Sequence, residues 1–209
     1  MLIPMSRLTE IYHVAPKGIL HLGANVAEEA ADYDRAGVKN VIWVECHPGA
    51  LQALQAAVKP YPLNSIFFGA VSDADDQEVS FHKTSNGMSS SLLPLLKHKE
   101  KHPEVVADGV ITVKTITVDT LFKRAALSPS DYDFANLDLQ GAELLALRGA
   151  EKYLESCRWV YTEINTEELY LGGALFPEVD KFLTNRGFRL VEKKLWSDFH
   201  AWGDAFYSR

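Results

Sequence analysis

Residues 18–25 read GILHLGAN, a short apolar run that ends at Gly23. Such a run, bounded by a glycine, is typical of a buried β-strand. The residues that follow predict a helix over Val26–Ala36, and Gly37 is placed to stop it. A strand that leads directly into a helix is the first half of a β-α-β unit, so this stretch predicts an α/β fold.

The same order of strand and helix repeats along the chain. A second apolar strand is predicted at Val41–Glu45, a helix at Pro48–Val58 and a third strand at Ser65–Val71. After an irregular middle the pattern resumes, with strands predicted at 132–139, 159–164, 188–195 and 205–207 and helices at 141–155 and 177–185. Because the strands are apolar almost throughout, they predict a doubly wound, mostly parallel sheet covered on both faces.

The middle of the chain departs from this alternation. Strands are predicted at Glu78–His82 and Val110–Val118, and the stretch Thr84–Val106 between them is polar, with consecutive serines and a basic run. We predict one domain over residues 1–209, with an N-terminal extension at 1–17 and an inserted segment at about 82–112.

Composition narrows the class of protein. The chain has 209 residues, of which 47% are hydrophobic and 23% charged, as in ordinary globular proteins. Its net charge of -7 argues against a protein that grips nucleic-acid phosphates. The two cysteines do not form a disulfide scaffold or a zinc motif. Neither a signal peptide nor a membrane-spanning run is visible, so we expect a cytoplasmic protein without membrane partners.

Ligands of open α/β sheets bind beyond the carboxyl ends of the strands. The first strand is followed by Gly23, whose alternative interpretation is a turn that needs glycine for its geometry alone. Glu45 ends the second strand about 20 positions later, the spacing of an acid that binds ribose hydroxyls, although it could also be an exposed strand end. Asp138 lies among apolar residues, where a carboxylate needs a partner, and its alternative role is to cap a helix that starts near Gly141.

Three blocks of this chain resemble one family. They read ILHLGAN at 19–25, WVECHP at 43–48 and NLDLQGAE at 136–143, and together they are similar to the FkbM-type methyltransferases. The third block is the most specific, and the resemblance extends from about Gly18 to Ala205. It implies the class I, Rossmann-like methyltransferase fold, with a seven-stranded sheet whose last strand is antiparallel.

The resemblance also implies a cofactor, S-adenosylmethionine, and the residues around it. The implied contacts are the methionine end at Gly23, Ala24 and Asn25, the ribose at Glu45, the adenine at Cys46, His47, Val71 and Ser72, and the sulfonium and amino end at Asp138. The serine-rich stretch that includes Ser90 is either a flexible surface loop or a lid whose serines contact the cofactor carboxylate or the acceptor. The family usually has an acid where this chain has His21 and a glycine where it has Ala27. A neutral His21 could accept a hydrogen bond from the cofactor, or it could be a core histidine.

The resemblance favours methyl transfer to an oxygen of a small molecule or carbohydrate. Asp138, Glu163 and Asn165 follow neighbouring strands, and we predict them as catalytic residues. Their oxygens could instead bind Mg²⁺ as in catechol-type O-methyltransferases, but a metal is not favoured. The base for the acceptor hydroxyl is left open among His47, His82, His98, His102 and His200, and Trp196, Phe199 and Trp202 could wall the acceptor site.

Two other functions are weighed against this one. An NAD-dependent oxidoreductase would need G-x-G-x-x-G after the first strand, and Asn25 and Glu28 occupy its second and third glycine positions. A non-catalytic relative that binds a nucleotide or S-adenosylmethionine as an interaction module is the remaining alternative, and His21 and Ala27 are the features that favour it. An oligomer is possible, because leucines at 92, 93, 95 and 96 could pack against a partner.

Overall fold

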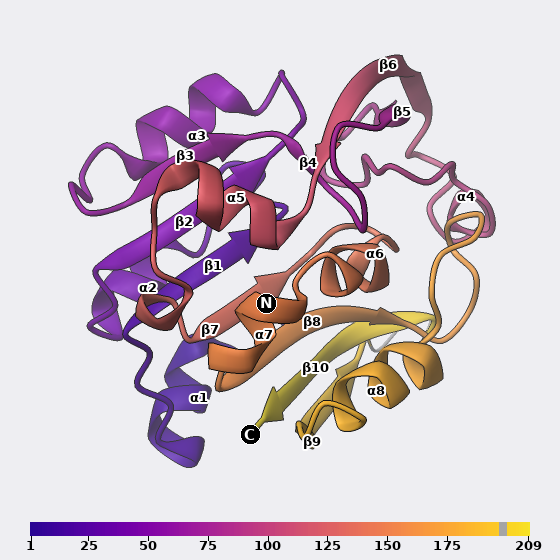
Figure 1. Ribbon diagram of the computed structural model, residues 1–209. Helices are drawn as coiled ribbons and strands as arrows, with labels where there is room; N and C mark the ends of the chain where they lie inside the picture. Colours follow the sequence, from indigo (N-terminus) through magenta and orange to yellow (C-terminus); the bar gives the residue numbers. More distant parts are fainter. Residues whose placement is uncertain (197–199) are drawn as a thin grey trace.

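The computed structural model describes residues 1–196 and 200–209, and its centre is a seven-stranded sheet (Figure 1). The strand order is β3-β2-β1-β7-β8-β10-β9, in which β10 pairs antiparallel with both neighbours and the other pairs are parallel. The bounds are β1 (Gly18–Leu22), β2 (Asn40–Glu45), β3 (Ser65–Phe68), β7 (Phe134–Leu137), β8 (Trp159–Asn165), β9 (Arg189–Leu195) and β10 (Trp202–Ser208). The predicted α/β fold with a mostly parallel seven-stranded sheet is confirmed.

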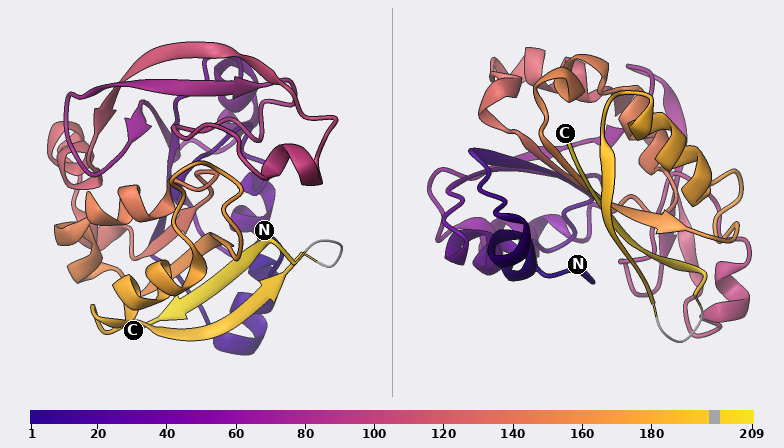
Figure 2. Two further views of the ribbon diagram at one scale, coloured as in Figure 1. Left: turned by 90° about the vertical axis from the view of Figure 1, so that its right-hand side faces the viewer. Right: turned by 90° about the horizontal axis from the view of Figure 1, so that it is seen from below.

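Helices cover both faces of this sheet (Figures 1 and 2). One face carries α5 (Val118–Ala125), α6 (Glu143–Arg148), α7 (Glu151–Ser156) and α8 (Phe176–Thr184), and the other carries α1 (Met5–Tyr12), α2 (Ala30–Arg35) and α3 (Leu51–Val58). Successive side chains of a strand point to opposite faces. In β1, therefore, Leu20 and Leu22 pack into the core under α5–α8, and Ile19 packs into the core under α1–α3.

A small second sheet lies at the carboxyl end of the parallel strands (Figure 1). It consists of β4 (Ala70–Val71), β6 (Ala107–Ile116) and β5 (Glu78–Thr84), in the order β4-β6-β5. The chain between β5 and β6 contains the short helix α4 (His98–Lys101). The segment predicted as an insertion is thus built around an antiparallel strand pair, and it approaches the edge where ligands of this fold bind.

Close backbone contacts explain where the elements differ from the sequence prediction. The helix predicted at 141–155 is divided into α6 and α7 near Gly149, where a Cβ would lie 2.2 Å from the carbonyl oxygen of Ser72. The strand predicted at 65–71 divides into β3 and β4, and β4 leaves the large sheet to pair with β6. The strand predicted to reach Val118 ends at Ile116, because the Thr117 side chain accepts a hydrogen bond from the Thr120 N–H and starts α5.

The first helix after β1 is shorter than predicted. Asn25 and Ala27 have left-handed backbone angles, with φ of 44° and 56°, so the regular helix α2 starts only at Ala30. The N-terminal segment contains α1, which buries Met5 and Leu8 in the second core. No helix in residues 1–196 and 200–209 is long and apolar enough to span a bilayer.

Candidate functional site

A cavity of about 700 Å³ opens at the carboxyl ends of β1, β2 and β7. Its wall includes Gly23, Glu45 and Asp138, one residue from the end of each of these adjacent strands. The inserted segment contributes the stretch 86–92, and the loop after β8 contributes Tyr170. The sequence prediction that these three strand ends meet at one ligand-sized space agrees with this geometry.

Gly23 holds the ends of β1 and β7 together. A Cβ at this position would lie 1.8 Å from the carbonyl oxygen of Asp138, and φ is +85°, so no other residue fits. The Asp138 N–H donates to the Leu22 carbonyl at 2.9 Å, which closes the contact. The N–H groups of Gly23 and Ala24 both donate to Val44, so these two amides serve the sheet and are not free for a ligand.

Glu45 is fixed by three backbone hydrogen bonds. Its Oε1 accepts from the N–H groups of Cys46 and His47 at 2.7 and 2.6 Å, and its Oε2 accepts from Asn25 at 2.7 Å. The residue is 8% exposed and lines the cavity. A carboxylate has about four acceptor positions, so Oε2 keeps one for a ligand hydroxyl.

The residues predicted around the adenine are only partly brought together. Cys46, His47 and Val71 line the cavity, but Ser72 does not, because its N–H donates to the Ile116 carbonyl and its backbone lies against Gly149. Burial raises the pKa of the Cys46 thiol, which therefore stays protonated at neutral pH. The His47 ring meets the Phe81 ring edge-on at 5.9 Å.

The serine-rich stretch is folded onto the cavity. Ser90 Oγ accepts a hydrogen bond from the N–H of Thr84, the last residue of β5, at 3.0 Å, which fixes the turn that follows this strand. Ser91 Oγ donates to the Gln140 carbonyl at 2.8 Å. The Ser89 carbonyl lies 3.4 Å from the Tyr170 hydroxyl. Ser90 and its neighbours thus line the wall, and the Ser91 hydroxyl also holds the insertion to the sheet edge, while the contact of Ser90 with a ligand stays a prediction.

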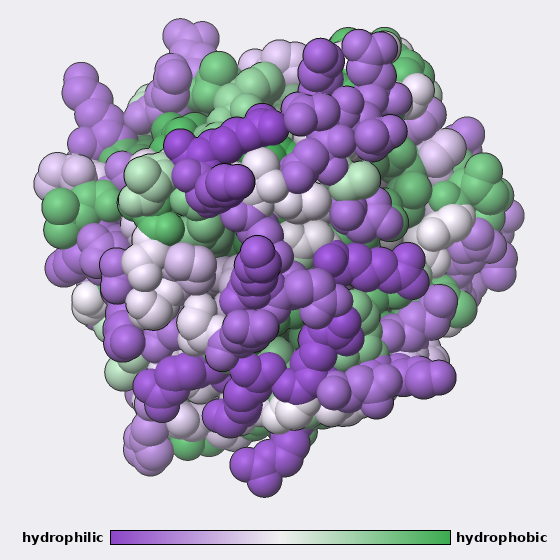
Figure 3. Space-filling model, viewed as in Figure 1, coloured by the Kyte–Doolittle hydropathy of each residue, from purple (hydrophilic) through white to green (hydrophobic). Residues whose placement is uncertain are grey.

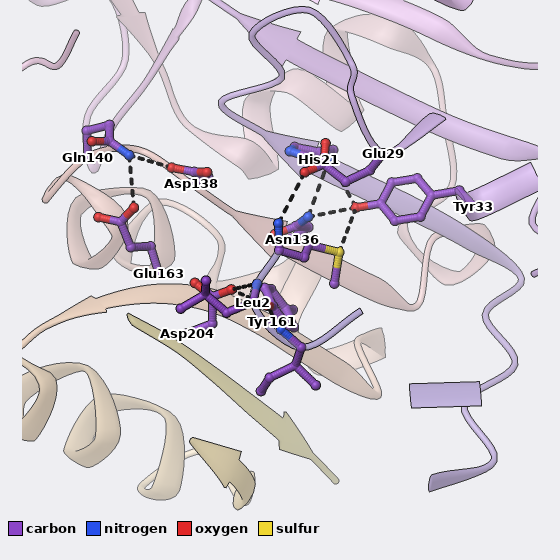
Figure 4. A network of polar contacts seen from close by, with 12 residues as sticks. Leu2, His21, Glu29, Tyr33, Asn136, Asp138, Gln140, Tyr161, Glu163 and Asp204 are labelled. Atoms are coloured by element: carbon purple, nitrogen blue, oxygen red, sulfur yellow. Dashed lines mark hydrogen bonds and ion pairs between the residues drawn. The ribbon is translucent and has the colours of Figure 1, made fainter. Parts of the chain in front are cut away.

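The side-chain amide of Gln140 joins two carboxyl groups (Figure 4). Its Nε2 donates to Asp138 Oδ1 at 2.7 Å and to Glu163 Oε2 at 2.9 Å, and its Oε1 accepts from the Tyr170 hydroxyl at 2.6 Å. Gln140 itself has a left-handed φ of 55°, which turns its side chain toward the cavity. The sequence indicated Gln140 only as part of the third block, and nothing in the sequence pointed to Tyr170.

The two carboxyl groups on Gln140 differ in exposure. Asp138 is exposed to the open cavity, and its pKa is raised to about 6, chiefly because the surrounding protein withholds water from part of its carboxylate. Glu163 is 7% exposed, and burial followed by the charge of Asp138 raises its pKa well above the ordinary value. The charge of Asp138 thus disfavours ionisation of Glu163, so the two carboxyl groups titrate as a pair and not independently. Asp138 does not cap α6: the Glu143 carboxylate instead accepts from the N–H groups of Leu139 and Gly141.

Asn165 is separate from these acids. It is 3% exposed, and among residues 1–196 and 200–209 its Oδ1 finds no hydrogen-bond partner and it does not belong to the cavity wall. The described residues contain no group of three or more His, Cys, Asp and Glu side chains placed to bind a metal ion. Since the amide of Gln140 already lies between Asp138 and Glu163, we derive no step through a metal.

His21 is part of a buried polar cluster. The residue is 2% exposed, and its Nδ1 lies 3.1 Å from the Tyr33 hydroxyl and 3.4 Å from Asn136 Nδ2. Its ring lies 4.9 Å from the Trp43 ring. Burial lowers the pKa of His21, so the ring is neutral at pH 7. His21 is therefore a core residue that also borders the cavity, and its hydrogen bond with the cofactor stays a prediction.

Some of the remaining candidate site residues border the cavity, and others do not. His47, His98 and His102 border it, whereas His82 and His200 do not. The Trp196 and Trp202 rings stack 5.2 Å apart at the wall, and Phe199 lies outside the described residues.

Two of the leucines considered for a partner contact, Leu93 and Leu95, pack within the chain against a cluster that includes Tyr170. Sequence analysis gave no binding role to four acids of the wall, namely Glu28, Glu29, Glu104 and Asp204.

Comparisons with known proteins agree with this geometry. The model of the methyltransferase FkbM domain family matches residues 16–190. The 2-O-methyltransferase NoeI of Sinorhizobium fredii (strain NBRC 101917 / NGR234) is 29% identical over 163 residues, which cover 74% of this chain and 65% of NoeI. The chain therefore spans less than two thirds of that relative.

Solved structures share the fold at low sequence identity. Methyltransferase FkbM from Methylobacillus flagellatus KT aligns with a TM-score of 0.62 and 14% identity, covering 99% of this chain and 47% of its own. Streptococcus pneumoniae Sp1610, a putative tRNA (m1A22) methyltransferase in complex with S-adenosyl-L-methionine, aligns with a TM-score of 0.51 and 14% identity, covering 98% and 72%. At these identities the likeness supports the fold alone.

Proposed function

The chain belongs to the methyltransferase FkbM domain family, and from this premise we propose that it transfers a methyl group from S-adenosylmethionine to a hydroxyl oxygen of a small-molecule or carbohydrate acceptor. The observation that supports the proposal most directly is the meeting of Gly23, Glu45 and Asp138 in one cavity of about 700 Å³. A volume of this size suits a ligand as large as a nucleoside with an amino-acid arm.

The residues present fit the cofactor. Glu45 keeps one acceptor position on Oε2 for a ribose hydroxyl, while three N–H donors hold the carboxylate in place. Cys46, His47 and Val71 offer the neighbouring wall for the adenine, and the turn at Gly23 borders the methionine end. Bound S-adenosylmethionine would supply a methyl group already activated by the positive charge on its sulfur.

The acceptor hydroxyl must lose its proton as its oxygen takes the methyl group. We assign this proton to the pair of Asp138 and Glu163, because Gln140 joins the two, the pKa of Asp138 is raised to about 6 and the pKa of Glu163 is raised well above its ordinary value. Positioning the acceptor oxygen in line with the methyl group would supply much of the rate enhancement. Asn165 has no contact with the acceptor in this proposal, because it lies outside the wall.

The acceptor is proposed to be neutral rather than a nucleic acid. The net charge of -7 and the carboxyl groups of the wall would repel a phosphate backbone. Hydroxyl groups, by contrast, are good donors to carboxylates, and the Trp196–Trp202 stack adds an apolar surface beside them. The 2-O-methyltransferase NoeI is consistent with oxygen as the methylated atom.

Isothermal titration calorimetry tests the cofactor, and mass spectrometry after incubation with mono- and oligosaccharides tests the acceptor. We expect the purified chain to bind S-adenosylmethionine and its demethylated product but not NAD. Glu45→Gln should weaken binding by about tenfold, as expected for loss of one charge-assisted hydrogen bond, while the exposed Glu10→Gln control should not. Absence of S-adenosylmethionine binding by the folded wild-type chain would refute the proposed function.

Binding of the cofactor without transfer to any sugar in the panel would favour the non-catalytic alternative. The buried, neutral His21 is the observation that supports this alternative, because it offers no charge to the cofactor.

A further inference from the structure

We propose that the carboxylate of Asp138 makes the cavity bind S-adenosylmethionine more tightly than its demethylated product, S-adenosylhomocysteine, because it attracts the positive charge on the cofactor's sulfur. This inference rests on the proposed function and concerns how the same cavity releases its product. The two ligands share the adenosine, the amino group and the carboxylate. They differ by one methyl group and one positive charge, so a wall that favours positive charge separates them.

The first support is the charge of the wall. Seven acids line the cavity, namely Glu28, Glu29, Glu45, Glu104, Asp138, Glu163 and Asp204, whereas none of the lysines and arginines of residues 1–196 and 200–209 does. Basic side chains lie on the outer surface instead, as Arg124 of α5 and Arg148 of α6 do, and Figure 3 shows hydrophilic side chains over these helices. A cleft lined by one sign of charge focuses its potential, so this cavity attracts a cationic ligand.

Two histidines of the wall do not cancel this charge. Burial lowers the pKa of both His21 and His98, so these rings are neutral at pH 7. The negative potential of the acids therefore acts on a ligand without compensation from these two side chains.

The second support is the position of Asp138 (Figure 4). It follows β7, and its backbone packs against Gly23 at the end of β1. Neighbouring strands lie about 4.8 Å apart, so the end of β7 is roughly 10 Å from the end of β2, where Glu45 lies. With the ribose at Glu45 and the methionine end at Gly23, as proposed above, the sulfur of the cofactor would lie on the side of Asp138.

The carboxylate of Asp138 is also open to a ligand. Its Oδ1 accepts a hydrogen bond from Gln140 Nε2 at 2.7 Å, and its side chain is exposed to the cavity. A carboxylate has about four acceptor positions, so this contact leaves part of the group facing the space that the ligand would fill.

The other acids of the wall add to the potential from different places. Glu45 is held by three backbone N–H groups at the ribose end, and Asp204 accepts from the Leu2 N–H and the Tyr161 hydroxyl. Glu163 is 7% exposed. Glu28 and Glu29 belong to the segment between β1 and α2, and Glu104 follows α4. Two of these acids, Glu28 and Glu104, are exposed and therefore serve as controls for Asp138.

The charges around Asp138 link this attraction to product release. Burial raises the pKa of Asp138 most, the hydrogen bond from Gln140 lowers it, and the charges of Asp204 and Glu29 raise it again. A positive charge beside Asp138 offsets this repulsion.

Methyl transfer removes that positive charge. As the new C–O bond forms and the S–C bond breaks, the electron pair of the S–C bond stays on the sulfur, which becomes a neutral thioether. The proton of the acceptor hydroxyl passes to the pair of Asp138 and Glu163, as proposed above. The attraction between Asp138 and the sulfur is then lost, so the product is held less tightly than the cofactor.

Calorimetry at two salt concentrations tests this proposal without a methyl acceptor. At about 20 mM salt we expect wild type to bind S-adenosylmethionine about tenfold more tightly than S-adenosylhomocysteine, and at about 500 mM the ratio should fall to about threefold. Asp138→Asn should weaken S-adenosylmethionine by about tenfold and leave two neutral thioethers, S-adenosylhomocysteine and 5′-methylthioadenosine, within about twofold of wild type. Glu28→Gln and Glu104→Gln each remove an exposed acid of the same wall and should change the ratio by less than about twofold.

The outcomes separate this inference from the proposed function. If wild type binds S-adenosylhomocysteine as tightly as S-adenosylmethionine, the inference is wrong, although the function stands. If the ratio persists in folded Asp138→Asn, or falls equally in a control variant, Asp138 is not its source. A ratio that does not change with salt would mean that the methyl group and not the charge is recognised, and this holds even if Asp138→Asn fails to fold. If folded wild type does not bind S-adenosylmethionine, the function and the inference are both wrong. Thermal unfolding of each variant verifies folding.

Discussion

Acids lie at both ends of the cavity, the Glu45 end and the Gln140 end, but the groups that hold them in place differ. At the Glu45 end, the backbone itself donates every hydrogen bond that the carboxylate receives. At the Gln140 end, side chains from separate elements, Gln140 and Tyr170, organise Asp138 and Glu163. Backbone donors set a fixed geometry, whereas a side-chain network with shifted pKa values can gain and lose protons. The first arrangement suits binding and the second suits proton transfer.

The contact between β1 and β7 joins the two ends of the cavity, so disrupting it should give the largest loss in the free energy of unfolding. In Gly23→Ala the new Cβ would meet the Asp138 carbonyl oxygen at 1.8 Å, at a left-handed φ of +85°. We expect a loss of at least about 3 kcal/mol in the free energy of unfolding, measured by urea denaturation.

Gly37→Ala is the matched control, because Gly37 has nearly the same φ of +84° but no atom of the described residues lies within 4 Å of its added Cβ. It should lower the free energy of unfolding by only about 1 kcal/mol, because alanine is strained in the left-handed conformation. Equal losses in the two variants would show that the β1–β7 contact is not what Gly23 protects.

The acids of the Gln140 end should make stability depend on pH. Glu143, 1% exposed, accepts from the backbone on both sides of Gln140, and burial raises its pKa from 4.5 to about 7. Between these pH values the folded chain keeps a proton that the unfolded chain has released, so stability falls as pH rises. We expect the free energy of unfolding to drop on the order of 2–3 kcal/mol from pH 4.5 to 7.5.

Glu143→Gln should flatten this dependence, because the amide cannot titrate. Urea denaturation at several pH values measures it, with the exposed Glu155→Gln as the control. An unchanged slope in Glu143→Gln would contradict a raised pKa at this residue.

The two ends differ in how far the sequence could predict them. Gly23 and Glu45 follow apolar strands at a recognisable spacing, and the strand order brings them together. The amide of Gln140 and the approach of Tyr170 depend on a left-handed φ at a non-glycine residue and on a loop after β8. No periodicity encodes such torsion angles, because φ > 0 in non-glycine residues is set by tertiary contacts. Asn165 shows the same limit: it ends a strand beside Glu163 but lies outside the wall.

Removing the bridging amide should affect one end only. Gln140→Ala deprives Asp138 and Glu163 of their shared donor and leaves the buried Tyr170 hydroxyl with the Ser89 carbonyl at 3.4 Å in place of the Gln140 acceptor at 2.6 Å. We expect a loss of about 2 kcal/mol in the free energy of unfolding, as for buried polar groups left unsatisfied. Binding of 5′-methylthioadenosine, which depends on the Glu45 end, should stay within twofold of wild type.

Gln77→Ala is the control for this variant, since the Gln77 amide is exposed and donates to the nearby Asp75 carbonyl. Calorimetry and urea denaturation measure both quantities. A parallel loss of 5′-methylthioadenosine affinity in Gln140→Ala would mean that the two ends form one cooperative unit.

The smallest expected effect concerns the inserted segment that covers the Gln140 end. Ser91 Oγ donates to the Gln140 carbonyl at 2.8 Å and accepts from the Leu93 N–H at 3.0 Å. Ser91→Ala should cost about 1 kcal/mol, the usual net contribution of such hydrogen bonds, and lower the midpoint of thermal unfolding by a few degrees. Ser128→Ala, whose hydroxyl meets only Ser130 at an exposed site, should cost less. If the two variants unfold alike, Ser91 does not anchor the insertion, and the Gln140 end is held by the sheet and Tyr170 alone.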